Sequence, residues 1–182
     1  MGDPARGVLY AAYTQQCGIM KLDINSGAKL GWAVAASTDT FGVNAPQCGF
    51  GGDGQAAAGG QDVKLSVDIR QITVDSTGNL YIADAGNGRV RKVDVVSKKI
   101  STIAGNGASM QFTGDQGPAT KASLWQPSGL AVTVVDDVRG VGGKRKVLYI
   151  ADTGTLLLLL LLSVRYQPKT WCHMSESDPE FH

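Results

Sequence analysis

The sequence NLYIAD at residues 79–84 decides the fold, because versions of it occur three times in this chain of 182 residues. The other two copies are VLYAA at residues 8–12 and VLYIAD at residues 147–152. A short apolar strand that ends in a polar turn cannot bury both faces of its sheet alone. Copies of one unit that stack against each other build a continuous core. The repetition therefore predicts a repeat protein.

The similarity between the copies extends beyond the apolar strand. A shift of 71 positions, which places Leu9 on Leu80, also aligns IMKLD at residues 19–23 with VRKVD at residues 90–94. A second phrase, which begins as FGGDG at Phe50, returns as FTGDQ at Phe112. Two phrases that recur in the same order indicate a repeated module.

The module itself has the pattern of four short strands. Between residues 69 and 104, segments rich in β-branched and aromatic residues alternate with turn-forming clusters such as STGN and AGNG. The connections are too short for parallel crossovers, and no segment has helical periodicity. We therefore predict one antiparallel four-stranded sheet over residues 69–104, with Tyr81 and Ile82 in an interior strand.

At the level of residues, this module resembles the NHL-repeat family of β-propellers. The similarity covers residues 50–154 and is weaker over residues 7–49, where Tyr13 replaces the strand-end Asp and Gly18 replaces Arg89. The segments that carry it are GNLYIADAGNGRVRKVD at 78–94, IAG at 103–105, GDQGPAT at 114–120 and QPSGLAV at 126–132. The resemblance implies an all-β fold, a partial β-propeller of about two to three four-stranded antiparallel blades. Because closed propellers have about four to eight blades, we expect this one to be unclosed.

The composition changes after residue 154. All 24 glycines precede residue 155, whereas both histidines follow it, and residues 156–162 are leucines. We assign residues 7–154 to NHL-like blades and residues 155–182 to a poly-leucine and non-repeat tail, disordered or artefactual. In the alternative interpretation, some of the leucines supply the third strand of the last blade. The leucine run is too short for a membrane span, which needs roughly 20 apolar residues.

The chemistry of the repeat region is limited by the residue types it lacks. Residues 1–154 contain neither His nor Glu, so a Ser-His-Asp or Cys-His nucleophilic system cannot be assembled there. A zinc site of the usual His and Cys kind is excluded in the same way. We therefore predict no catalytic residue, no cofactor and no metal, and a protein that is not an enzyme.

The strand ends supply the candidate structural residues. A carboxylate before a Gly-containing turn can accept backbone N–H groups and hold that turn. The candidates for this role are Asp84, Gly86, Asn87, Gly88, Asp152 and Gly154. Asp53 and Asp115 lie in Gly-rich loops and are assigned to turns, with a calcium site as the alternative. Cys17 and Cys48 can form a bridge only if their Cα atoms lie within about 7 Å, and we expect free buried thiols.

The candidate interaction residues are Arg89, Arg91 and Lys92, a local basic cluster in a chain whose net charge is only +1. A solvated edge strand protected by charge is the favoured interpretation. The predicted function is therefore a protein-interaction or scaffold module with an unknown protein partner. The alternatives are an RNA-binding face and a fragment of a propeller enzyme whose active site is missing. We also expect self-association through the open faces of the blades.

Overall fold

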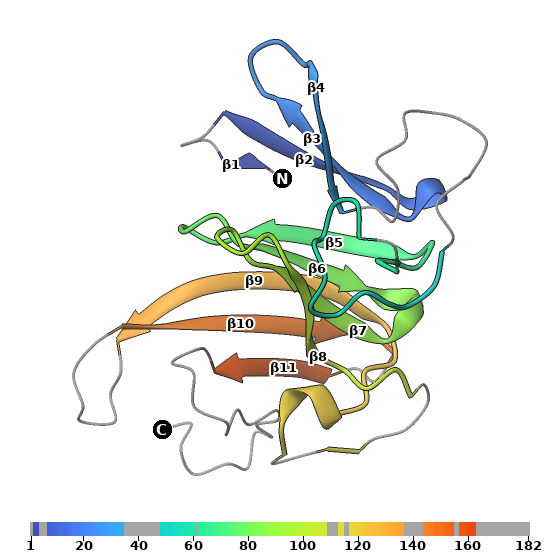
Figure 1. Ribbon diagram of the computed structural model, residues 1–182. Helices are drawn as coiled ribbons and strands as arrows, with labels where there is room; N and C mark the ends of the chain where they lie inside the picture. The colour runs from blue at the N-terminus through green and yellow to red at the C-terminus, as the bar shows by residue number, and fades with distance from the viewer. Residues whose placement is uncertain are drawn as a thin grey trace.

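The computed structural model is an all-β molecule in which three antiparallel sheets follow one another in chain order (Figure 1). It describes residues 2–3, 7–34, 48–60, 62–108, 113–114, 117–136, 144–154 and 157–162. Within these residues the only helical segments are short 3₁₀ turns, η1 (Thr14–Gln16), η2 (Ala85–Asn87) and η3 (Ala119–Lys121). None of the described helices is long and apolar enough to span a membrane.

The first two sheets each have four strands in the order of the sequence. The first sheet consists of β1 (Gly2–Asp3), β2 (Val8–Tyr13), β3 (Gly18–Asp23) and β4 (Lys29–Val34). The second consists of β5 (Ile69–Val74), β6 (Leu80–Asp84), β7 (Arg89–Val93) and β8 (Ile100–Ala104). The predicted antiparallel sheet over residues 69–104 is thus confirmed, with Tyr81 and Ile82 in an interior strand.

The third sheet has the order β11-β10-β9. It consists of β9 (Pro127–Asp136), β10 (Lys144–Asp152) and β11 (Leu157–Leu162). The leucine run was expected to belong to a non-repeat tail, but Leu157–Leu162 pair along the length of β10 from Asp152 to Val147. These leucines therefore supply a third strand, as in the alternative interpretation, because an apolar segment next to an unpaired strand edge satisfies its backbone hydrogen bonds there. Residues 163–182 lie outside the described residues.

The core has two parts, one on each side of the second sheet. Ile82 on β6 belongs to a cluster with Ile19 and Val34 of the first sheet. Its neighbour Tyr81 points the other way and packs with Leu148 of the third sheet. Since successive side chains of a strand face opposite sides of its sheet, β6 is covered on both faces. This explains why every residue in its first four positions is apolar.

The strand-to-strand turns of the first two sheets have the same geometry at positions 71 residues apart. The turn η1 ends at Cys17 (φ 49°) and the turn η2 ends at Gly88 (φ 56°), both in the left-handed region. One connection later, Gly27 (φ 69°) and Lys98 (φ 59°) again share this conformation. Cys17 and Lys98 are the only described non-glycine residues with positive φ. Each stands where the other sheet has glycine, the residue that adopts such a φ at least cost.

A disulfide joins Cys17 to Cys48, and their Cα atoms lie 5.4 Å apart. The expectation of free buried thiols was therefore wrong. The sequence could not show that Cys17, the αL residue after η1, lies next to Cys48 in the connection between the first and second sheets. The covalent bond links the turn between β2 and β3 to the connection between the first two sheets.

Candidate functional site

The strand-end carboxylate of Asp84 is fully buried and fastens a distant segment. Its Oδ1 accepts the backbone N–H of Ser66 at 2.8 Å, and its Oδ2 accepts the side-chain amide of Asn87, also at 2.8 Å. It caps no N–H of the turn η2 that follows it. Asp84 thus binds the chain just before β5 through Ser66, and it binds its own turn through the side chain of Asn87 rather than through the backbone N–H groups that we expected.

Asp152 holds the third sheet in the same way. Its two oxygens accept the backbone N–H groups of Trp125 and Gln126 at 2.9 and 2.6 Å, just before β9 begins. The glycine two residues after each aspartate lets that segment approach. A Cβ on Gly86 would lie 2.9 Å from Ser66 Cβ, and one on Gly154 would lie 2.6 Å from Trp125 Cγ.

Arg91 is completely buried, which corrects its assignment as an interaction residue. Its Nη2 donates to the carbonyl of Gly51 and to Asp53 Oδ1, both at 2.9 Å, and its Nη1 lies 3.6 Å from Asp84 Oδ2. Its Nε has no hydrogen-bond partner. A buried guanidinium needs such partners because removing a charge from water is costly. Asp53 lies in a turn, as expected, and its carboxylate also forms an ion pair with Arg91. Asp115 lies outside the described residues.

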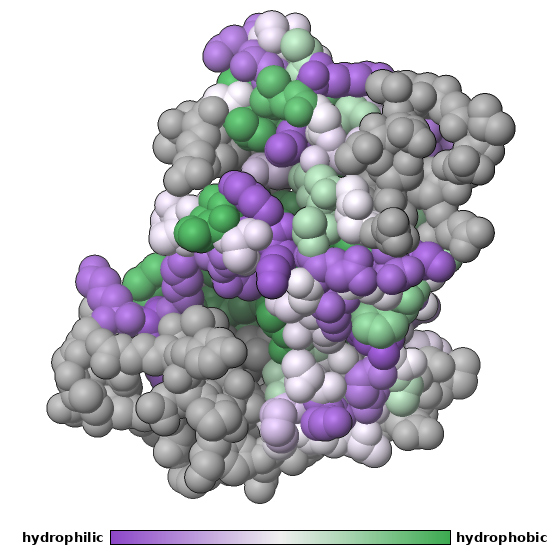
Figure 2. Space-filling view, viewed as in Figure 1, coloured by the Kyte–Doolittle hydropathy of each residue, from purple (hydrophilic) through white to green (hydrophobic). Residues whose placement is uncertain are grey.

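Arg89 and Lys92 do not extend a basic surface around Arg91. The guanidinium of Arg89 stacks over the ring of Phe50 at 3.8 Å and donates to the carbonyls of Asn87 and Asn106. Burial, reinforced by the charge of Arg91, lowers the pKa of Arg89. Lys92 forms an ion pair with Asp94 at 3.2 Å. On the face shown in Figure 2, hydrophilic side chains form a band across the middle that is bounded by hydrophobic patches.

A second polar cluster, centred on Asp75, was not predicted from the sequence. Asp75 Oδ2 accepts hydrogen bonds from Lys146 Nζ at 2.8 Å and from Tyr81 Oη at 3.1 Å, and its Oδ1 accepts the N–H of Asn79 at 2.9 Å. Burial alone would raise the pKa of Asp75, but the hydrogen bonds from Lys146, Asn79 and Thr77 outweigh it and hold the pKa well below its usual range. The pair of Asp75 and Lys146 joins the second sheet to the third. Its only sequence signal is the turn DSTGN, which begins with this aspartate.

Burial and the neighbouring Asp75 raise the pKa of Tyr81 well above its usual range. Tyr81 therefore stays a neutral hydrogen-bond donor. No described group of three or more His, Cys, Asp or Glu residues is arranged to hold a metal ion. The buried polar side chains thus connect backbone segments and sheets.

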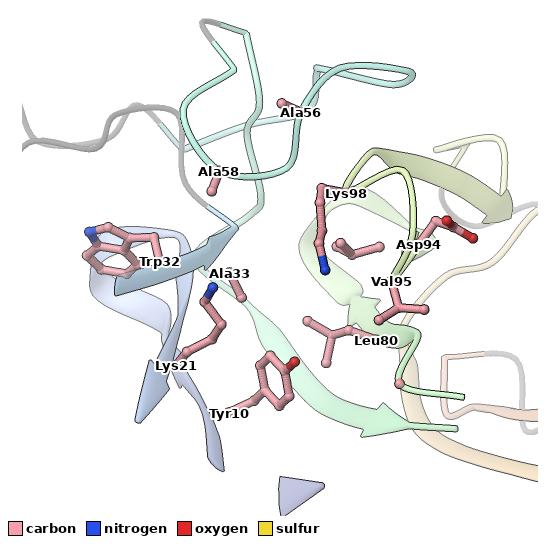
Figure 3. Close-up of a pocket in the computed structure, with 12 residues that line it drawn as sticks. Tyr10, Lys21, Trp32, Ala33, Ala56, Ala58, Leu80, Asp94, Val95 and Lys98 are labelled. Atoms are coloured by element: carbon pink, nitrogen blue, oxygen red, sulfur yellow. The ribbon is translucent and has the colours of Figure 1, made fainter. Parts of the chain in front are cut away.

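An open cleft of about 350 Å³ lies between the first and second sheets. Figure 3 shows Tyr10, Lys21 and Trp32 on one side of it, and Leu80, Val95 and Lys98 on the other. The first three come from β2, β3 and β4, whereas Val95 and Lys98 belong to the turn between β7 and β8. The small side chains of Ala56 and Ala58 close one end. A volume of this size suits a small ligand or a few residues of a peptide.

Comparison with known proteins gives a fold likeness only. No family model and no curated protein matches the chain. A structural genomics protein of unknown function from Bacteroides thetaiotaomicron is similar at 19% identity with a TM-score of 0.55, over 85% of this chain and 32% of that one. A protein named "Putative phosphatase" from the same organism is similar at 18% identity with a TM-score of 0.57, over 97% of this chain and 34% of that one. The chain spans about a third of the length of each.

Proposed function

We propose that the three sheets are blades of an NHL-like β-propeller and that they form a protein-interaction module without catalysis of its own. The order of the strands supports the blade assignment, as does the repeated fastening of the chain before β5 and β9 by a strand-end aspartate. Two longer structures, of each of which this chain spans about a third, share its fold.

The observation that carries the proposal is that the buried charged side chains bind backbone groups and join sheets. Asp84 and Asp152 bind backbone N–H groups, Arg91 is enclosed between acceptors, and Asp75 joins two sheets. These four charged side chains are thereby committed to holding the architecture. The cleft between the first two sheets is open to a partner, and it is lined in part by Trp32, a residue type enriched in binding hot spots.

RNA binding has less support than protein binding. A face that binds single-stranded RNA combines accessible cations with exposed aromatic rings. Arg91 is buried, Arg89 is hydrogen-bonded over Phe50, and Lys92 is paired with Asp94. The three basic residues are thus bound to groups of the protein itself and do not form one accessible basic surface.

A selection from a random peptide library on the immobilised full chain tests the proposal. We expect selected peptides to share a motif and to lose at least about tenfold in affinity on Trp32→Ala, because truncating an aromatic hot spot costs 2 kcal/mol or more. Val134→Ala is the matched control, since Val134 is exposed on the third sheet away from the cleft. Failure to select a motif, or equal loss in both variants, would contradict the proposal.

Two further measurements separate the alternatives. Filter binding of single-stranded RNA at several salt concentrations would favour the RNA interpretation if affinity fell steeply with salt, because phosphate contacts release counterions. Turnover of p-nitrophenyl phosphate would favour an enzyme. We expect neither from the full chain.

Self-association is part of the same proposal. Leu9 and Leu30 on the first sheet are 36% and 49% exposed, so a second copy that covers them would bury apolar area. We expect the elution volume in size-exclusion chromatography to fall as protein concentration rises. A monomer at every concentration would rule this out.

A further inference from the structure

We propose that the cleft between the first two sheets binds an oxyanion, a carboxylate or a phosphate, through Lys21 and Lys98, with Trp32 and Leu80 in contact with an adjoining apolar group. The inference rests on the proposed function, because it assigns the ligand chemistry of the surface that the binding module offers.

The first support is the direction of the two lysines. Lys21 reaches the cleft from β3 and Lys98 reaches it from the turn between β7 and β8. Figure 3 shows both amino groups pointing into the space between the two sheets, from opposite sides. The phenol of Tyr10 lies on the same side of the cleft as Lys21, and the side chain of Leu80 lies opposite. Cations on both walls with apolar surface between them suit a ligand that is charged at one end.

The second support is the charge balance of the cleft. Neither Lys21 nor Lys98 forms an ion pair within the described part of the chain. Asp94 is the acidic residue of the lining, but its carboxylate is bound to Lys92 and to the N–H groups of Val96 and Ser97. The N–H of Ser97 and the ammonium of Lys92 hold the pKa of Asp94 at about 2. Two like charges therefore face one cleft, and an anion between them would relieve their repulsion.

The third support is the backbone of Lys98. Gly27 occupies the matching position of the first sheet, and both turns close with the same hydrogen bond to the preceding aspartate carbonyl, Gly27 to Asp23 and Lys98 to Asp94. Lys98 nevertheless holds φ at 59°, a conformation that glycine would adopt with less strain. Strained positions cluster at functional sites. A lysine kept at this position directs its amino group into the cleft.

The test is a titration of the full chain with phenyl phosphate, phenylacetate and the neutral analogue benzyl alcohol, followed by NMR through the indole N–H of Trp32. We expect at least one of the two anions to bind, and the alcohol to bind more weakly than that anion. Lys21→Met and Lys98→Gly should each weaken anion binding at least about tenfold, because each removes a charge-assisted hydrogen bond. Lys99→Ala is the matched control, since it removes a neighbouring exposed charge outside the cleft.

The outcomes are separable. Binding of only one anion identifies whether the source is a phosphate or a carboxylate, and both results support the inference. Equal binding by wild type, Lys21→Met and Lys98→Gly, or absence of anion binding at the highest soluble concentration, overturns it. Lys98→Gly should melt no lower than wild type, so its loss of binding cannot be attributed to unfolding. Anion binding without selected peptides would remove the proposed function alone, whereas selected peptides without anion binding would remove this inference alone.

Discussion

The first and second sheets share one geometry but are fastened to the connection between them by different chemistry. In the first sheet, Cys17 closes the turn after β2 and forms a covalent bond to Cys48. In the second sheet, Gly88 closes the matching turn, and the buried pair of Asp84 and Arg91 binds the same connection through hydrogen bonds. One backbone arrangement can therefore be secured by a cross-link or by enclosed ions. The first sheet has Cys17 and the cross-link where the second sheet has Gly88 and relies on the buried ions.

The third sheet adds an intermediate case. Asp152 accepts two backbone N–H groups before β9, where Asp84 accepts one before β5. The register position of Arg91, opposite Ile82, is taken in the third sheet by Leu159, opposite Ile150. The third sheet thus has the carboxylate without the arginine. The three sheets together allow the contributions of the acid, the buried ion pair and the disulfide to be measured separately.

The largest effect should come from removing the acid that faces a buried cation. Asp84→Ala leaves the buried Arg91 with only one described acidic partner, the exposed Asp53. Breaking a buried ion pair costs about 3 to 5 kcal/mol. Asp152→Ala removes hydrogen-bond acceptors where the register position of the arginine holds leucine, so it should cost about 1 to 3 kcal/mol. Urea unfolding monitored by circular dichroism measures both. Equal losses would show that Arg91 does not depend on Asp84.

The disulfide of the first sheet should contribute nearly as much. Replacing both cysteines by serine removes a cross-link over a sequence separation of 31 residues, which should cost about 2 to 4 kcal/mol. The double variant Cys17→Gly with Cys48→Ser also lacks the bond but relieves the positive φ at residue 17, so it should be more stable by about 1 kcal/mol. Thermal melts of the two double variants without reductant make the comparison. The reverse order would mean that position 17 carries no backbone strain.

Acid should weaken the joint between the second and third sheets. The folded-state pKa of Asp75 is lowered, so its contribution is complete above about pH 5 and falls at lower pH as the unfolded chain, with a carboxyl pKa of about 3.9, takes up protons first. Lys146→Met should cost about 1 to 3 kcal/mol at pH 7 and should flatten this pH dependence. Urea midpoints between pH 3 and pH 7 measure the slope. An unchanged slope in the variant would show that Lys146 does not lower the pKa of Asp75.

The sequence predicted those parts of the fold that rest on local signals. The strands of residues 69–104 are bounded by turn residues, and the apolar run of β6 indicates burial on both faces. The burial of Arg91 could not be predicted, because arginine is mostly exposed and its acceptors Gly51 and Asp53 lie 40 and 38 residues away. A run of identical leucines has no sequence pattern that would fix its register against a neighbouring strand. The register of β11 against β10 could therefore not be predicted.

The cleft was not predicted because its lining comes from two sheets and a connecting loop. One signal was nevertheless present in the sequence. Under the shift of 71 positions Lys98 falls on Gly27, and Cys17 falls on Gly88. At both positions one copy of the repeat has glycine and the other has a reactive or charged residue. Cys17 forms the disulfide, and Lys98 lines the cleft.

The smallest expected effect is on the turn that carries Lys98. Lys98→Gly should stabilise the protein by about 1 kcal/mol or less, since the relief of positive φ is partly offset by the greater entropy of glycine in the unfolded chain. Gly27→Lys is the reciprocal change, and it should destabilise the protein by a similar amount. A thermal-melt series with wild type in the middle, Lys98→Gly above it and Gly27→Lys below it is the expected result. If Gly27→Lys were neutral, the turn would accept a lysine without strain, and the position of Lys98 would no longer need a functional explanation.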